Sequence, residues 1–247
     1  MFKYLFLGII QGLTEFFPVS SSAHLVIMQK VLGLIGQEVI LSVVLHLGTC
    51  FALIIFFFKD ILETLRNPKL VGLVIIVTFI TGTIGLMGKD LFEAMFKNIT
   101  LVAFALIITG MMLIFTRKFM DAKRDYVSLK DAVILGFVQA AAIIPGISRS
   151  GITISTLLCR RIDRQTSFKF SFIASIPAIF GATLLEAKKI TPALRTDMIN
   201  FIVGFIFSLL SGLFSLWVLR LCLRKAKLHY FGYYCIIVAM ITLLFIR

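Results

Sequence analysis

The sequence predicts an all-α, polytopic membrane protein that forms a single membrane domain over residues 1–247, and two observations lead to this prediction. Hydrophobic residues make up 60% of the chain and charged residues only 15%, whereas a soluble domain has roughly 45–50% and about 25%. The apolar residues also gather in runs that are long enough to cross a hydrocarbon core of about 30 Å as helices. This composition excludes a soluble enzyme, a nucleic-acid-binding module and a disordered chain.

Six apolar runs approach the length of about 20 residues that a helix needs to cross a bilayer. The expected spans are Val39–Phe58, Leu70–Met87, Ile99–Phe115, Phe170–Leu185, Ile199–Leu219 and Phe231–Ile246. Two other apolar regions are broken by proline, glycine and serine, which leaves arms that are too short to span. We expect these to be re-entrant helical hairpins, with arms Tyr4–Phe17 and Ala23–Ile35 around residues 18–22, and arms Ala132–Ile144 and 152–158 around residues 145–151.

The two halves of the chain repeat each other, because each element of the first half has a counterpart about 130 residues later. The segment Leu7–Gly12 resembles Leu135–Ala140, and both run into a proline followed by serines. Repeat 1 covers about residues 1–118 and repeat 2 about residues 129–247. Three spans and one hairpin give each repeat an odd number of crossings, so the second repeat is inserted upside down. Interrupted segments at matching positions of such repeats indicate a binding site near the midplane.

The basic residues behind the net charge of +13 are divided unevenly between the two sides of the membrane, in a way that fits this topology. Segments 59–69, 116–130, 158–169 and 220–230 together hold 16 Lys and Arg residues, and the connections on the other side hold 8. By the positive-inside rule the richer side is cytoplasmic, so both termini face outward. The charge then serves orientation and attraction to anionic membrane lipids, not binding of nucleic acid. Arg149, inside the second hairpin, is the one basic residue that belongs to neither count.

Polar side chains concentrate at the two hairpin tips, where irregular backbone is tolerated only if it is buried in protein or lines a polar cavity. They are Gln11, Glu15, Ser20, Ser21, Ser22 and His24 at the first tip, and Ser148, Arg149, Ser150 and Thr153 at the second. An ionisable residue within a membrane segment is a functional candidate by default. A carboxylate, an imidazole, hydroxyls and a guanidinium are the groups of a phosphoryl-transfer site. The alternative for Glu15 and Arg149 is a purely structural ion pair.

Individual side chains suit different parts of this chemistry. Arg149 matches phosphate oxygens with a planar fork of donors, and backbone N–H groups at the start of the following helix favour an anion. Glu15 together with Gln11 would hold a divalent cation, Mg²⁺ or Ca²⁺. His24 is suited to proton transfer near neutral pH. His46, in the middle of a span, has two interpretations: a helix-packing hydrogen bond, which we favour, or support of the residues at the site.

The segments 11–24 (QGLTEFFPVSSSAH) and 145–153 (PGISRSGIT) resemble the two signature motifs of the undecaprenyl-diphosphate phosphatase, or bacitracin-resistance, family. The resemblance extends over nearly the whole chain. It implies an enzyme of the bacterial plasma (inner) membrane that hydrolyses undecaprenyl diphosphate to undecaprenyl phosphate and inorganic phosphate. This activity recycles the lipid carrier for cell-wall synthesis and opposes bacitracin. The resemblance also implies a homodimer and a site open to the outer face.

Carried over by position, the family's catalytic residues correspond to Glu15, Ser21, His24 and Arg149. Its phosphate-binding motif corresponds to Ser148, Ser150 and Thr153, and we expect the same role for Ser20, Ser22 and Gly151. Many relatives have Glu where this chain has Gln11, so only one carboxylate remains for a metal. Ser22-Ala23 also stands where Thr-Gly is common, a change that keeps the hydroxyl.

The working hypothesis is an in-line attack by Ser21 on the terminal phosphorus, with His24 handling protons. Glu15 would orient His24 or Ser21, or share the cation with the diphosphate. Arg149, Ser148 and Ser150 would stabilise the transferring group. A water molecule or His24 itself are alternative nucleophiles. Two other classes of function compete with hydrolysis. One is a membrane transporter or flippase of polyprenyl phosphate, because paired broken helices are typical of secondary transporters; the other is a non-catalytic lipid-binding scaffold.

Overall fold

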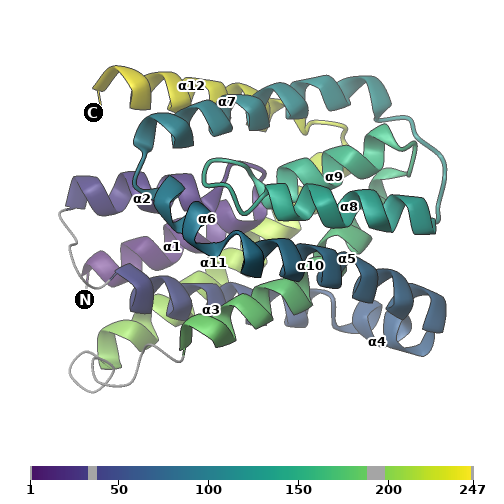
Figure 1. The fold of residues 1–247 in the computed structure, drawn as a ribbon, viewed down its shortest axis with the longest axis horizontal. Coiled ribbons are helices and arrows are strands. Elements are labelled where there is room, and N and C mark those ends of the chain that lie inside the picture. Colours follow the sequence, from purple (N-terminus) through teal and green to yellow (C-terminus); the bar gives the residue numbers. More distant parts are fainter. Residues whose placement is uncertain (1, 33–37, 188–197, 246–247) are drawn as a thin grey trace.

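The computed structural model describes residues 2–32, 38–187 and 198–245. Within these ranges the regular structure is entirely helical, apart from one isolated β-bridge between Arg124 and Ile162. The helices lie alongside one another as a bundle, and α1 begins at the same end of the bundle at which α12 ends (Figure 1). The prediction of an all-α fold is confirmed.

Four helices are long and apolar enough to cross a membrane: α5 (Pro68–Met87), α7 (Ile99–Phe115, extended by the 3₁₀ turn Thr116–Phe119), α10 (Arg164–Ala187) and α11 (Met198–Arg224). Helix α3 (Glu38–Phe56) continues into α4 (Phe58–Arg66) across a bend of 71°, and this pair qualifies together as a fifth. Helix α12 (His229–Phe245) is apolar but has only 17 residues. The part of the chain that the structure describes is therefore that of a multi-pass membrane protein.

Several helix ends differ from the sequence prediction, for one physical reason. Helix α10 begins at Arg164 instead of Phe170, and α11 continues past Leu219 to Arg224. A span predicted from hydropathy ends at the first charged residues, whereas the backbone hydrogen bonds of the helix continue past them. The amphipathic helices α4 and α6 (Lys89–Phe96) were not expected at all. Parts of the expected elements lie outside the described residues, namely 33–35 and Ile246, together with the basic residues Lys188, Lys189, Arg195 and Arg247.

Both broken regions form helical hairpins, as expected. The first consists of α1 (Phe2–Phe16) and α2 (Ser21–Leu32), and the second of α8 (Leu129–Ala141) and α9 (Arg149–Cys159). The hairpins approach from opposite ends of the bundle and their tips meet in its middle (Figure 1). At the junction the Ser150 hydroxyl donates to the Phe17 carbonyl at 3.3 Å, and the Gly146 N–H donates to Ser22 Oγ at 3.4 Å.

Each hairpin packs on a span that belongs to the other half of the chain. Helix α1 lies against α11 and α8 lies against α5, while α3 contacts α10 and α7 contacts α12. The contact of α1 with α11 is backbone to backbone, because a Cβ on Gly12 would lie 2.0 Å from Ser211 Oγ and 2.4 Å from the Ser208 carbonyl oxygen. Ser215 Oγ donates to the Gly12 carbonyl at 2.8 Å. Small residues of this kind let membrane helices approach closely.

A buried carboxylate, Asp131, links the two outer ends of the second hairpin, the start of α8 and the end of α9. Ser128 and Asp131 form a capping box at the start of α8, and the carboxylate also binds Arg124 at 2.7 Å and Arg160 at 2.8 Å. Burial on its own would raise the pKa of Asp131, but the hydrogen bonds from Arg124, Ser128 and Arg160 outweigh it and hold this pKa well below its usual range. The network ties the start of α8 to the end of α9.

Replacing Gly12 by Ala should destabilise the protein, since the added methyl group has no room against α11. We expect a loss of about 1–3 kcal/mol in the free energy of unfolding, as for an overpacked core. The measurement is the thermal unfolding midpoint of the purified protein in detergent. Gly72→Ala is the matched control, because no atom lies within 4 Å of its Cβ position, and its midpoint should stay or rise slightly. Equal midpoints for the two variants would contradict the close contact.

Replacing Asp131 by Asn should lower the free energy of unfolding by about 1–3 kcal/mol, because Arg124 and Arg160 lose their carboxylate. The pKa of Asp131 in the folded protein lies below the unfolded value of about 3.9. Its contribution is therefore complete above about pH 4 and disappears as the pH falls through the lowered pKa. The difference between wild type and variant should shrink accordingly in acid unfolding experiments.

The control for Asp131→Asn is Lys89→Gln, which removes an ion pair whose side chains are 54% and 59% exposed. Such an exposed pair contributes at most about 1 kcal/mol. A pH-independent loss in the Asp131 variant would show that the carboxylate charge is not what stabilises this end of the hairpin.

Candidate active site

Glu15 is the centre of the polar cluster at which the two hairpin tips meet, and its side chain is only 8% exposed. Its Oε1 accepts a hydrogen bond from Arg149 Nη2 on the opposite tip. Its Oε2 accepts from Ser21 Oγ at 2.7 Å and from Gln11 Nε2 at 3.1 Å, and His46 Nε2 lies 3.6 Å away. Helices α1, α2, α3 and α9 therefore all converge on one carboxylate.

The local sequence explains how α2 folds back onto this carboxylate. Gln11 and Glu15 are one helical turn apart on α1, as the sequence predicted. Helix α1 ends at Phe16, just before Pro18, since a proline lacks the N–H needed to continue a helix. Ser20 then adopts a φ of 66°, a left-handed conformation that costs energy for any residue other than glycine. This turn brings the Ser21 hydroxyl against Glu15.

Arg149 is the first residue of α9, which Ser148 caps by accepting a hydrogen bond from the Gly151 N–H at 3.2 Å. One arm of its guanidinium, Nη2, binds Glu15. The other arm, Nη1, is buried and has no hydrogen-bond partner in the part of the chain that the structure describes. An unsatisfied buried donor costs about 1–3 kcal/mol, and more when it is charged. The site therefore presents an unused, positively charged donor to a ligand oxygen.

His24 is held by two hydrogen bonds that fix its tautomer. Its Nδ1 lies 2.8 Å from the Ser20 carbonyl oxygen and its Nε2 lies 2.8 Å from Tyr234 Oη. A carbonyl only accepts, so in the neutral ring Nδ1 carries the proton and Nε2 accepts from the tyrosine. The two rings also stack, with centroids 5.7 Å apart. The Ser21 hydroxyl donates its hydrogen bond to Glu15 and not to His24.

The remaining predicted phosphate-binding residues surround the junction of the tips. Ser20 and Ser22 hydroxyls lie 3.1 Å apart, and Ser148 and Ser150 hydroxyls 3.3 Å apart. The Thr153 hydroxyl is committed to the Arg149 carbonyl and to Ser171, both at 2.6 Å. Thr153 thus fastens α9 to α10, behind the residues that face Glu15.

The structure adds residues to this site that sequence reasoning missed or interpreted differently. His46 was interpreted as a packing residue, yet its ring nitrogen approaches Glu15. Tyr234 binds His24 from α12. Thr109 on α7 donates to the Gly146 carbonyl and accepts from the Ser148 N–H, at 3.1 and 3.0 Å. An ionisable or hydroxyl residue in the middle of an apolar run was the available signal for His46 and Thr109.

The predicted metal ligands lie side by side, and Gln11 Oε1 is buried with no hydrogen-bond partner among the described residues. In the same part of the chain, no three His, Cys, Asp or Glu side chains are close enough to form a metal site on their own. The donors present, an amide oxygen and one carboxylate, are of the type that Mg²⁺ and Ca²⁺ prefer. They fit a cation that also takes oxygens from a ligand.

Three buried rings, Phe57, Phe168 and Phe172, form what we call the aromatic layer. Their centroids lie 5.2, 5.2 and 5.8 Å apart, and each side chain is at most 3% exposed. Phe172 lies against the Arg149 guanidinium, with the Cζ atom 5.9 Å from the ring centroid. The layer therefore places apolar rings from the bend between α3 and α4 and from α10 next to Arg149.

Comparison with known proteins shows the family of the chain. The family model described as bacitracin resistance protein BacA matches residues 4–241. A protein of Halothermothrix orenii named undecaprenyl-diphosphatase is 40% identical over 99% of this chain and 97% of its own length. Proteins of the same name from Carboxydothermus hydrogenoformans and Methanobrevibacter smithii are 41% and 37% identical, over 94% and 96% of this chain and 92% and 94% of their own.

A double-mutant cycle on Glu15 and Arg149 should show strong coupling in the free energy of unfolding. Either Glu15→Gln or Arg149→Gln leaves one buried charge uncompensated, which costs about 3–5 kcal/mol. The double variant removes both charges and should be more stable than the sum of the single losses predicts, by about 1–3 kcal/mol. Thermal or denaturant unfolding in detergent measures all four proteins.

Ser21→Ala is the control for this cycle, because it removes one hydrogen bond to Glu15 and no charge, at a cost of about 1 kcal/mol. Strictly additive losses for Glu15 and Arg149 would mean that the two charges do not depend on each other.

Proposed function

The chain belongs to the bacitracin resistance protein BacA family, and on that premise we propose that its hairpin-tip cluster hydrolyses undecaprenyl diphosphate to undecaprenyl phosphate and inorganic phosphate. The protein is a membrane-embedded phosphatase, and its action on this lipid accounts for a role in cell-wall synthesis and bacitracin resistance. One observation supports the assignment of the site above all others. Arg149 pairs through one arm with the same carboxylate that holds the Ser21 hydroxyl, and its other arm has no partner among the described residues, so a phosphate binder and a nucleophile are adjacent.

In the first step the terminal phosphate of the substrate takes the free Nη1 donor of Arg149. As the guanidinium turns toward phosphate, the ion pair between Arg149 and Glu15 weakens. Glu15 then accepts the Ser21 proton more readily. Ser21 Oγ attacks the terminal phosphorus in line. The bond from phosphorus to the bridging oxygen breaks, and its electron pair leaves with undecaprenyl phosphate.

In the second step a water molecule attacks the phosphorus of phosphorylated Ser21. The bond between phosphorus and Ser21 Oγ breaks, and inorganic phosphate leaves. Glu15 returns its proton to Ser21 Oγ, while the pair of His24 and Tyr234 takes the proton of the water. The hydroxyls of Ser20, Ser22, Ser148 and Ser150 would hold the oxygens of the transferring group.

A divalent cation, Mg²⁺ or Ca²⁺, would be held by Gln11 and Glu15. When bound, it would offset the negative charge of the diphosphate. The Glu that many relatives carry at the position of Gln11 would bind such a cation more tightly than the amide does.

The proposed topology has six spans and two re-entrant hairpins in two inverted repeats. The exchange of partners between the halves supports it, since α1 packs on α11 as α8 packs on α5. The four segments rich in Lys and Arg also gather at one end of the bundle (Figure 1). On this topology both termini and the mouth of the site lie on the outer face of the membrane. The family resemblance further implies the plasma (inner) membrane and a homodimer.

Phosphate release tests the proposal. Purified protein in detergent receives a polyprenyl diphosphate with Mg²⁺ or Ca²⁺, and we expect release to fall at least about 100-fold in Glu15→Ala and in Arg149→Ala. The exposed residues Glu93 and Arg117 provide matched controls, because their alanine variants should keep the wild-type rate. A transporter or a scaffold would release no phosphate in any variant.

Ser21→Ala separates the possible nucleophiles in the same assay. Loss of the hydroxyl should abolish release if Ser21 carries the phosphoryl group, and near-normal release would assign the attack to water or His24. Trapping of ³²P on the wild-type protein, absent in Ser21→Ala, gives an independent readout of the intermediate.

A further inference from the structure

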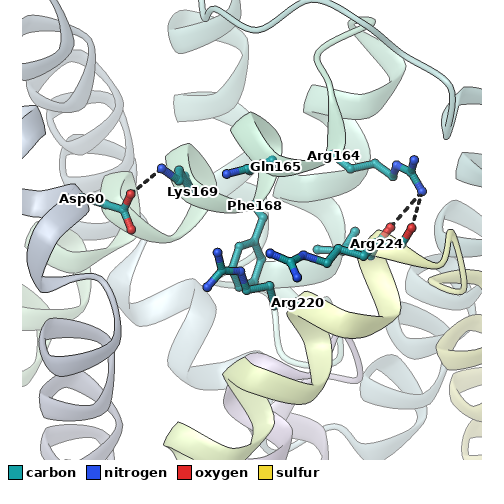
Figure 2. Close-up of a pocket in the computed structure, with 8 residues that line it drawn as sticks. Asp60, Arg164, Gln165, Phe168, Lys169, Arg220 and Arg224 are labelled. Carbon is teal, nitrogen blue, oxygen red and sulfur yellow. Dashed lines mark hydrogen bonds and ion pairs between the residues drawn. The ribbon is translucent and has the colours of Figure 1, made fainter.

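A second group of charged side chains lies outside the hairpin tips, where α4, α10 and α11 meet. A pocket there is lined by Asp60, Arg164, Phe168, Lys169, Arg220 and Arg224, among others. Figure 2 shows the guanidinium groups of Arg220 and Arg224 beside the ring of Phe168. Phe168 belongs to the aromatic layer, and none of the residues that line the pocket belongs to the hairpin-tip cluster.

The pocket carries an excess of positive charge that its own residues do not neutralise. Lys169 Nζ pairs with Asp60 at 2.5 Å. Arg164 donates to the carbonyls of Leu223 and Arg224 at the end of α11, at 3.2 and 2.8 Å. No carboxylate lies within ion-pair distance of Arg220 or Arg224 among the described residues. These two arginines are four residues apart on one helix, an arrangement of like charges that is unfavourable without an anion.

The two arginines continue a stripe of exposed apolar side chains along α11. Residues at intervals of three or four line up on one face of a helix, and here they are Ile206, Leu210, Phe214, Trp217, Arg220 and Arg224. The four apolar members are 44–55% exposed. Tryptophan is enriched where hydrocarbon meets the headgroup region. The stripe therefore changes from apolar to cationic at the point where a lipid changes from acyl chain to phosphate.

We propose that this pocket binds the phosphate of an anionic phospholipid whose acyl chain lies along the α11 stripe. The guanidinium groups of Arg220 and Arg224 bind the phosphate oxygens, and Trp217 contacts the start of the chain. A free phosphate ion would use the cationic pocket alone and leave the apolar stripe without a role. This site is separate from the hydrolysis proposed above and does not depend on it.

Trp217 is the single tryptophan of the chain, so its fluorescence reports on lipid at this site. The full-length protein is placed in nanodiscs of phosphatidylcholine that contain an equal small fraction of brominated phosphatidylglycerol or brominated phosphatidylcholine. Bromine quenches tryptophan on contact, and we expect stronger quenching by the anionic lipid. In the double variant Arg220→Gln/Arg224→Gln the preference should fall by about 30-fold, as expected for two arginines at an anionic lipid surface.

The matched control is Arg66→Gln/Arg117→Gln, which removes two exposed arginines from the same end of the bundle but outside the pocket. This variant should keep the preference, and unchanged unfolding midpoints should show that both double variants are folded. Equal quenching by the two lipids in the wild type, or an equal loss in both double variants, would overturn the proposal. Binding of millimolar inorganic phosphate that depends on Arg220 and Arg224, together with equal quenching by the two lipids, would assign the pocket to the free ion.

Discussion

The ion pair between Glu15 and Arg149 joins the two hairpins, and the rest of the site depends on it. No arm of either hairpin is long enough to cross a membrane, and the tips carry the opposite charges of Glu15 and Arg149. Burying either charge alone would cost several kcal/mol, so both tips are stable only where they meet. The same pair orients the Ser21 hydroxyl through Glu15 and leaves one arm of Arg149 unused. The contact that joins the two hairpins is therefore also the contact that orders the site.

Much of this arrangement could be predicted from the sequence, because the strongest signals are local. Long apolar runs predicted helices, and Pro18 and the Pro145-Gly146 pair predicted where two of them break. Glu15 and Arg149 stood out because a charge in an apolar segment is costly unless it is paired or used. The contact of His24 with Tyr234 was beyond such reasoning, since 210 residues separate them. Amphipathic helices such as α4 were also missed, because hydropathy alone does not distinguish them from loops.

The hydrogen bonds give Ser21 and His24 different partners, a distinction that the sequence could not make. From the sequence, Glu15 could orient either of the two residues. In the structure the turn at Ser20 directs Ser21 toward Glu15, while His24 on the next turn of α2 faces α12 and Tyr234. The two side chains therefore belong to separate hydrogen-bonded pairs, which is the arrangement that the proposed mechanism uses for its two proton transfers.

The aromatic layer bears on how well the membrane around this protein holds a proton gradient. A membrane that stores a proton gradient loses it when a continuous chain of hydroxyls, charged groups and water crosses the membrane, because protons leak along such a chain. Phe172 lies beside Arg149, and Phe168 lines the pocket that holds the arginines of α11; neither ring donates or accepts protons. Such rings offer a moving proton no group to bind, so they oppose proton leakage through the part of the bundle that they fill.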